Sequence, residues 1–233
     1  MPASILLSHA GSLSVNVVDK DGKPAINAVV MVYPSSPTPS TQAPPSALTL
    51  SQASMQFSPA VALVQVGAKV TFVNNDPWDH HVRGSASGAK EFASGAADGF
   101  SFRLAGRANS AASGATTGAT SGATSTAANK ISSSVVTFDK AGVTLLACYL
   151  HGSMTGHVVV SDTPWAAKTD ADGMATFSDM PDGVVQIKTW HSAQFVDIAP
   201  VNNSIKPGAN QAKIQLNVAI ASKRRFSNPP EYK

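Results

Sequence analysis

Apolar residues in this chain come in short runs bounded by turn residues, and this spacing restricts the fold more than any other feature. Residues 12–18 alternate polar and apolar side chains, a turn follows at 19–24, and residues 27–33 run back. Such alternation is typical of a strand with one buried face. Further strands are expected at 61–66, 69–73, 80–82, 90–92, 100–104, 134–138, 143–148, 157–161, 174–177, 184–190 and 213–219. The chain is therefore predicted to be all-β.

Composition excludes several classes of protein. With a net charge of +3 and a pI near 9.0, the chain is too weakly basic to indicate nucleic-acid binding, and its one tight basic cluster lies in a predicted solvated tail, residues 223–233. The apolar runs fall well short of the ~20 residues that a membrane-spanning helix needs. The first ten residues lack a basic start and a full apolar stretch, so no export signal is visible.

Two segments interrupt the strands. Residues 34–45 are rich in Pro, Ser and Thr and are predicted to be a linker or open loop. Residues 105–133 nearly repeat Ser-Gly-Ala-Thr and contain almost no large apolar side chains. Such a stretch buries too little surface to offset the entropy lost on ordering, so it is predicted to be a flexible insertion. We do not expect it to touch the functional site.

The segment around the only cysteine carries the strongest chemical signal. An apolar strand ends in Cys148, and His151 and Met154 follow at intervals of three residues before the next apolar strand. With one cysteine, no intramolecular disulfide can form. A thiolate, an imidazole and a thioether together suit copper, and a trigonal His₂Cys site with a weak axial Met is the type 1 arrangement. Zinc gains little from a thioether.

A second imidazole must come from elsewhere, and the segment Asn74–Val82 offers two. In a strand that begins at His80, the side chains of His80 and Val82 point to one face and that of His81 to the other. If Val82 packs inward, His80 faces the site. His80 is therefore the preferred ligand, and the role of His81 stays open between a supporting contact and a competing ligand.

These residues carry a family resemblance. Val70-x-Phe72-x-Asn74-x-Asp76-x₃-His80-x-Val82, followed by Cys148-x₂-His151-x₂-Met154, resembles the cupredoxins, and the short ligand loop is similar to that of amicyanin. The resemblance covers residues 47–162 and implies a Greek-key β-sandwich. It also implies one type 1 copper ion held by His80, Cys148, His151 and axial Met154.

The two ends of the chain carry a second resemblance. Residues 11–33, with Asp21-Gly-Lys-Pro24, resemble the first half of a transthyretin-like, carboxypeptidase-regulatory-type β-sandwich, and residues 169–177 with Met180-Pro-Asp-Gly183 resemble its second half. The copper domain is therefore expected to be inserted into a second, discontinuous sandwich formed by residues 1–36 and 163–222. The layout resembles bacterial plastocyanin-like and methylamine-utilization proteins, which are exported. This implies a periplasmic carrier of single electrons with a redox protein partner, and leaves room for protein or glycan contact at the outer sandwich.

Other functions rank lower. A copper storage or delivery protein would be expected to cluster its Met or His residues, and the six methionines are scattered. A purely structural or partner-binding sandwich is the other alternative. The chain has no His-x-His pairs of multicopper oxidases and no hydrolase or phosphate-binding motif, so it is not expected to be an enzyme. His157 is predicted to lie on the surface, and Trp190–His191 to be a core tryptophan beside a partly exposed histidine.

Overall fold

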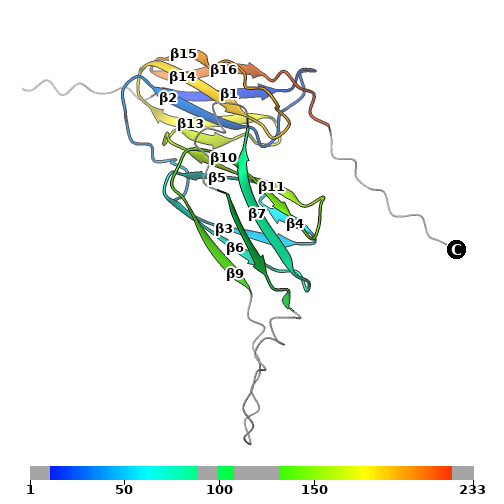
Figure 1. Cartoon of the computed structure of the whole chain (residues 1–233). Coiled ribbons are helices and arrows are strands. Elements are labelled where there is room, and N and C mark those ends of the chain that lie inside the picture. Colours follow the sequence, from blue (N-terminus) through cyan, green and yellow to red (C-terminus); the bar gives the residue numbers. More distant parts are fainter. Residues whose placement is uncertain (1–10, 89–98, 108–131, 222–233) are drawn as a thin grey trace, which may run out of the picture.

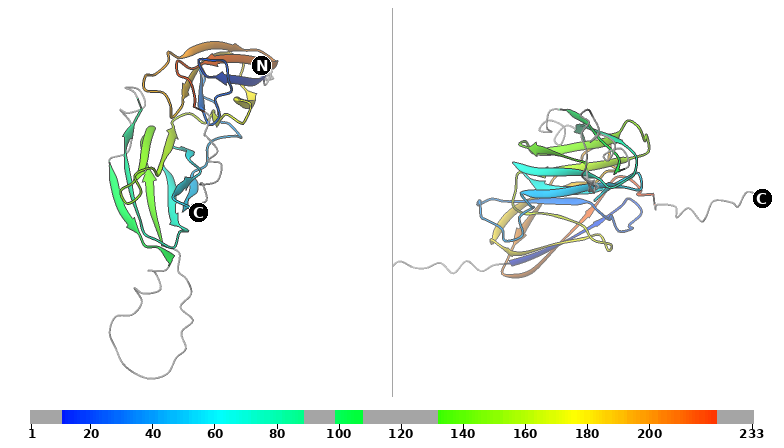
Figure 2. Two further views of the ribbon diagram at one scale, coloured as in Figure 1. Left: turned by 90° about the vertical axis from the view of Figure 1, so that its right-hand side faces the viewer. Right: turned by 90° about the horizontal axis from the view of Figure 1, so that it is seen from below.

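The computed structural model describes residues 11–88, 99–107 and 132–221. Sixteen strands in these residues form four sheets. The sheets form two pairs, one built from both ends of the chain and one from its middle, and Figure 1 shows the first pair above the second. Figure 2 gives the same arrangement from two further directions.

The first pair, which we call the outer pair, combines a three-stranded sheet ordered β13-β1-β16 with a four-stranded sheet ordered β12-β2-β14-β15. Strand β1 runs antiparallel to β13 and parallel to β16, so the last strand lies beside the first. The strands are β1 (Gly11–Val18), β2 (Val29–Pro34), β12 (Ala166–Lys168), β13 (Met174–Met180), β14 (Gly183–Trp190), β15 (Val201–Ile205) and β16 (Gly208–Gln215).

The second pair, the inner pair, combines a five-stranded sheet ordered β5-β11-β10-β7-β8 with a four-stranded sheet ordered β4-β3-β6-β9. Its strands are β3 (Ala47–Ala53), β4 (Gln56–Ser58), β5 (Val61–Gln65), β6 (Ala68–Asn74), β7 (His80–Ser87), β8 (Phe100–Leu104), β9 (Ser133–Phe138), β10 (Gly142–Cys148) and β11 (Thr155–Ser161). Parallel neighbours β5 and β11, and β3 and β6, give this pair its crossed connections.

Each pair encloses its own core, and a third apolar layer joins the pairs. Alternate residues of β2, such as Val30 and Val32, enter the outer core, whereas Val29 and Met31 face the inner pair. Both faces of β2 are thus buried, which explains why its sequence is continuously apolar rather than alternating. The joining layer contains Val29, Met31, Ala166 and Trp190 of the outer pair and Val61, Leu63, Val143 and Val159 of the inner pair.

The strands predicted from alternation are confirmed for the most part within the described residues. Four strands went unpredicted, namely β3, β4, β12 and β15, and the last strand ends at Gln215 rather than continuing to Ala219. Residues 19–22 and 170–173, which both have the sequence Asp-x-Asp-Gly, form turns in which Asp19 and Asp170 each accept backbone N–H groups two and four residues ahead. The predicted strand at 90–92, the tail at 223–233 and most of the insertion at 105–133 lie outside the described residues.

Strand ends of the inner pair place the chemistry-bearing residues together. Strand β7 begins with His80, β10 ends with Cys148, and the two strands pair so that Cys148 lies opposite Val82. The joining layer meets β10 at Val143, the other end of the strand. In the described part of the chain, no helix has the length and hydropathy needed to cross a membrane.

Candidate metal centre

Three donor atoms from two distant parts of the chain converge at the end of the inner pair. The Nδ1 atoms of His80 and His151 lie 3.2 Å apart, and each lies 3.6 Å from the Sγ atom of Cys148. His80 is fully buried, Cys148 is 3% exposed and His151 is half-buried. Among the described residues, these three form the one group of His, Cys, Asp or Glu donors close enough to hold a metal ion.

The spacing of these atoms fits a three-coordinate site. Imidazole and thiolate bonds to a first-row metal measure about 2.0–2.3 Å, so donors at the corners of a planar triangle lie about 3.5–4.0 Å apart. Two of the observed separations fall in this range, and the third, between the two imidazoles, is slightly shorter. The residues therefore fit a metal ion at the centre of the triangle with little rearrangement.

The loop between β10 and β11 is closed by its own backbone. The N–H of His151 donates to the carbonyl of Cys148, that of Met154 to His151, and that of Cys148 to Met154. These bonds hold the predicted ligands of the loop in a compact turn whose two ends are fixed in the sheet. Met154 is 1% exposed and packs in the same core as Cys148 and Leu146. Its side chain therefore belongs to the apolar core of the inner pair.

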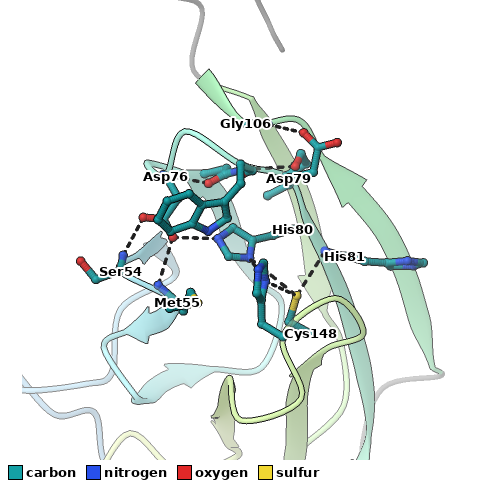
Figure 3. Close-up of polar contacts among 12 residues, drawn as sticks. Ser54, Met55, Asp76, Asp79, His80, His81, Gly106 and Cys148 are labelled. Carbon is teal, nitrogen blue, oxygen red and sulfur yellow. Dashed lines mark hydrogen bonds and ion pairs between the residues drawn. The ribbon is translucent and has the colours of Figure 1, made fainter. Parts of the chain in front are cut away.

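Asp76 holds the far side of the His80 ring. Its Oδ2 atom lies 2.8 Å from Nε2 of His80, and its carboxylate also accepts the backbone N–H groups of Ser54 (2.6 Å) and Met55 (3.1 Å). Figure 3 shows Asp76 between His80 and the turn that contains Ser54 and Met55, with His80 between Asp76 and Cys148. Burial raises the pKa of Asp76, but the hydrogen bonds from His80 and the two N–H groups outweigh it, so its pKa lies below the ordinary value.

Asn74 fixes the backbone that carries Asp76 and His80. Its carboxamide nitrogen donates to the carbonyls of Trp78, Leu104 and Ala105, and its oxygen accepts the N–H of Asp76. The side chain is fully buried, so these bonds have no competition from water. Asn74 thus ties the segment before β7 to the end of β8, and sets the position from which His80 enters the site.

His81 contributes its backbone rather than its ring. Its N–H lies 3.4 Å from the Sγ atom of Cys148, while its Nε2 atom lies 2.6 Å from the hydroxyl of Ser101 on β8. In Figure 3 its side chain points away from Cys148. The two adjacent histidines therefore face opposite sides of the sheet, as the alternation of β7 requires. Hydrogen bonds to the cysteine sulfur are one of the means by which proteins adjust a copper centre.

Comparison with known families identifies the inner pair. The profile of a family described as copper binding proteins, plastocyanin/azurin family, matches residues 45–161, which is half of the chain. The chain belongs to the plastocyanin/azurin family. Copper is thus the cofactor, and the residues that this cupredoxin brings together, two imidazoles and a thiolate, have the donor types that copper takes.

Solved structures with similarity to this cupredoxin include amicyanins. A mutant amicyanin in its oxidized form is 19% identical, with a TM-score of 0.32, and the match covers 57% of this chain and 98% of that one. Amicyanin from Paracoccus versutus is 18% identical, with a TM-score of 0.32, over 56% and 97%. A copper-containing nitrite reductase from Thermus scotoductus is 20% identical, also at 0.32, over 54% and 23%. No curated protein matches the chain.

Two other histidines differ from their predicted settings. His157 is half-buried between the two sheet pairs rather than on the surface, and its ring lies 5.1 Å from that of Trp190. His191 is 5% exposed rather than partly exposed, and its ring nitrogens pair with Ile26 O and the N–H of Ala193. Neither ring belongs to the His80–Cys148–His151 group that could hold a metal ion.

Asp76 is the site residue to which the sequence analysis gave no role. The signal was present, because a carboxylate four residues before a histidine ligand is well spaced to reach its outer nitrogen across a turn. The turn at Ser54–Met55, which supplies the other two hydrogen bonds, had no signal in the sequence. Its residues have positive φ angles of 52° and 58°, a conformation that glycine or asparagine normally occupies.

Proposed function

We propose that this chain carries single electrons through one type 1 copper ion held by His80, Cys148, His151 and, as axial donor, Met154. The observation that carries the proposal is the triangle of Nδ1, Nδ1 and Sγ atoms at the end of β7 and β10. A copper ion supplies a one-electron couple when it is bound. The chain supplies donors whose positions are fixed by the sheet and by a hydrogen-bonded loop, so little has to move when the charge changes.

The surface around His151 supports exchange with a redox protein. Three large apolar side chains near the site are well exposed, Trp78 at 41%, Tyr149 at 61% and Leu150 at 55%. Arg83 donates to the Tyr149 hydroxyl and adds a positive charge beside them. Exposed apolar groups rimmed by polar ones are typical of protein interaction sites. We propose that a partner docks here and that electrons pass through the half-buried ring of His151.

A visible-absorption spectrum of the copper-loaded protein tests the function. We expect an intense band from the copper–thiolate bond in the oxidised protein, reversible bleaching on reduction, and loss of the band in Cys148→Ser. Ser153→Ala, in the same loop but outside the donor group, is the control and is expected to keep the band. A Cys148→Ser variant with unchanged colour would overturn the proposal. Colourless Cu(I) binding with rapid release to a chelator would indicate copper delivery instead.

We propose that the protein works in the periplasm, that it has no enzymatic activity of its own, and that residues 47–162 form a domain inserted into a second sandwich. The pairing of β1 with β16 at opposite ends of the chain supports the last point. Fractionation of the native host with an antibody to this chain tests the location, and limited proteolysis within residues 34–45 tests the domain division.

A further inference from the structure

The contacts around Asp76 are those of a carboxylate that is built into the fold for its charge. It is 5% exposed, yet each of its oxygens accepts a hydrogen bond within the protein. Oδ1 accepts the N–H of Ser54, and Oδ2 accepts the N–H of Met55 and faces Nε2 of His80. A buried carboxylate that is surrounded by donors is retained in its ionised form.

The turn that supplies two of these donors is held in an unfavourable conformation. Ser54 and Met55 both have positive φ angles, a conformation that residues other than glycine seldom adopt unless neighbouring contacts hold them there. The N–H groups of both residues point at Asp76. The hairpin of β3 and β4 therefore forms a cradle for the carboxylate, and the carboxylate offsets the strain of the hairpin.

His80 connects Asp76 to the proposed metal position, because its Nε2 atom faces Asp76 and its Nδ1 atom faces Cys148. An ionised carboxylate can only accept a hydrogen bond, so Nε2 of His80 carries a proton, and in the neutral ring that a metal ligand requires Nδ1 then presents its lone pair. Nδ1 is the atom that lies 3.6 Å from Cys148 Sγ. A carboxylate on the outer nitrogen of a ligand histidine fixes the tautomer and ring orientation and makes the ligand more basic.

We propose that Asp76 is a positioning residue that fixes the His80 tautomer and, through its buried negative charge, favours Cu(II) over Cu(I) and lowers the reduction potential. This inference rests on the proposed copper site. A buried negative charge stabilises the more highly charged ion more strongly, because Coulomb energies are large away from water. The two N–H groups of the Ser54–Met55 turn keep the charge in place.

The first test uses metal-free protein. Two-bond ¹H–¹⁵N correlation spectra distinguish the two neutral imidazole tautomers. We expect neutral His80 to be protonated on Nε2 in the wild type. In Asp76→Asn we expect a mixture of the Nε2-protonated and Nδ1-protonated tautomers. A wild-type His80 protonated on Nδ1 would overturn the inference whether or not copper binds and whether or not the variant folds.

The second test measures copper affinity and reduction potential. In Asp76→Asn we expect Cu(II) affinity to fall about 10–100-fold, the usual effect of losing such a partner. Cu(I) affinity should fall less than Cu(II) affinity, so the reduction potential should rise. Each factor of ten between the two losses of affinity corresponds to about 59 mV for a one-electron couple. Equal losses for both ions, or a potential equal to that of the wild type, would contradict the role of the charge.

Two matched controls separate charge from fold. Asp79→Asn removes a carboxylate next to His80 in sequence, but one whose partners are Arg103 and the N–H of Gly106. We expect its potential to shift much less than that of Asp76→Asn. Ser54→Gly keeps the N–H donor and relieves the positive φ, so its potential should stay at the wild-type value. Absence of copper binding by the wild type would refute the proposed function and leave the tautomer test standing.

Discussion

Two adjacent histidines at the start of β7 have opposite roles because a strand alternates its side chains. His80 points into the core and presents Nδ1 to the sulfur of Cys148, whereas the ring of His81 turns out to Ser101. The contact between His81 and the sulfur comes from the backbone, which every residue except proline supplies. Position in the strand, rather than residue type, separates the two.

The two histidines should therefore respond differently to the same substitution. His81→Asn should keep the visible band and change copper affinity by less than about threefold, because its N–H is retained. His80→Asn should lose the band, because one of the two imidazole donors is removed. Absorption titration with Cu(II) measures both. Loss of the band in His81→Asn would make its ring a ligand and would reverse the assignment.

Met154 allows a separate test of the axial position. Met154→Leu preserves the volume of a fully buried side chain, so we expect unfolding to become easier by less than about 1.5 kcal/mol. Loss of the weak thioether donor should raise the reduction potential while the copper–thiolate band persists. Voltammetry and urea unfolding measure the two effects. An unchanged potential would show that the sulfur does not approach the metal.

At the scale of elements, the segment between β6 and β7 depends on one buried carboxamide. Removing Asn74 leaves the carbonyls of Leu104 and Ala105 and the N–H of Asp76 without their partner. Each buried group left unpaired costs about 1–3 kcal/mol, so Asn74→Ala should lose at least ~2 kcal/mol of unfolding free energy.

Urea unfolding of the metal-free protein measures this loss. Asn75→Ala is the matched control, because the neighbouring side chain pairs with Arg107, an exposed residue, and should lose less than about 1 kcal/mol. Similar stabilities for the two variants would show that the Asn74 network is not what fixes the segment.

The elements were predictable from sequence where one face of a strand meets water or where a loop carries its own signal. The loop that carries the proposed ligands has such a signal, because Cys148, His151 and Met154 lie within seven residues. The strand β4 is three residues long and too short for periodicity to show. The turn at Ser54–Met55 contains no glycine or asparagine that would mark it in the sequence. Its conformation is held instead by hydrogen bonds to Asp76, which is distant in sequence. Tertiary contacts of this kind leave no local pattern.

In the molecule as a whole, the two sheet pairs meet around two histidines, the half-buried His157 and the buried His191. Burial, and secondarily the nearby charge of His191, lowers the pKa of His157 to about 4, and burial also lowers the pKa of His191. Lys168 is another titratable group there, since its ammonium donates to the carbonyl of Val61, the residue paired with His157 across the strands. These two histidines therefore bind protons more readily in the unfolded chain than in the folded protein.

Stability should consequently fall on acidification. The contribution of His157 is complete above its unfolded pKa of about 6.5 and is lost as the pH drops toward 4, for a change of about 2–3 kcal/mol. Urea unfolding between pH 7 and pH 4 measures the slope, which should flatten in His157→Phe. An equally steep slope in that variant would place the acid sensitivity elsewhere.

The joining layer meets β10 at Val143, while Cys148 terminates the same strand at its other end. The exposed Tyr149–Leu150 edge beside the candidate metal centre therefore lies at the end of β10 away from the joining layer. A protein bound to the sheet of β1, β13 and β16 would leave that edge accessible. If the proposed redox partner docks at that edge, the outer pair is available for a separate contact while the inner pair exchanges electrons.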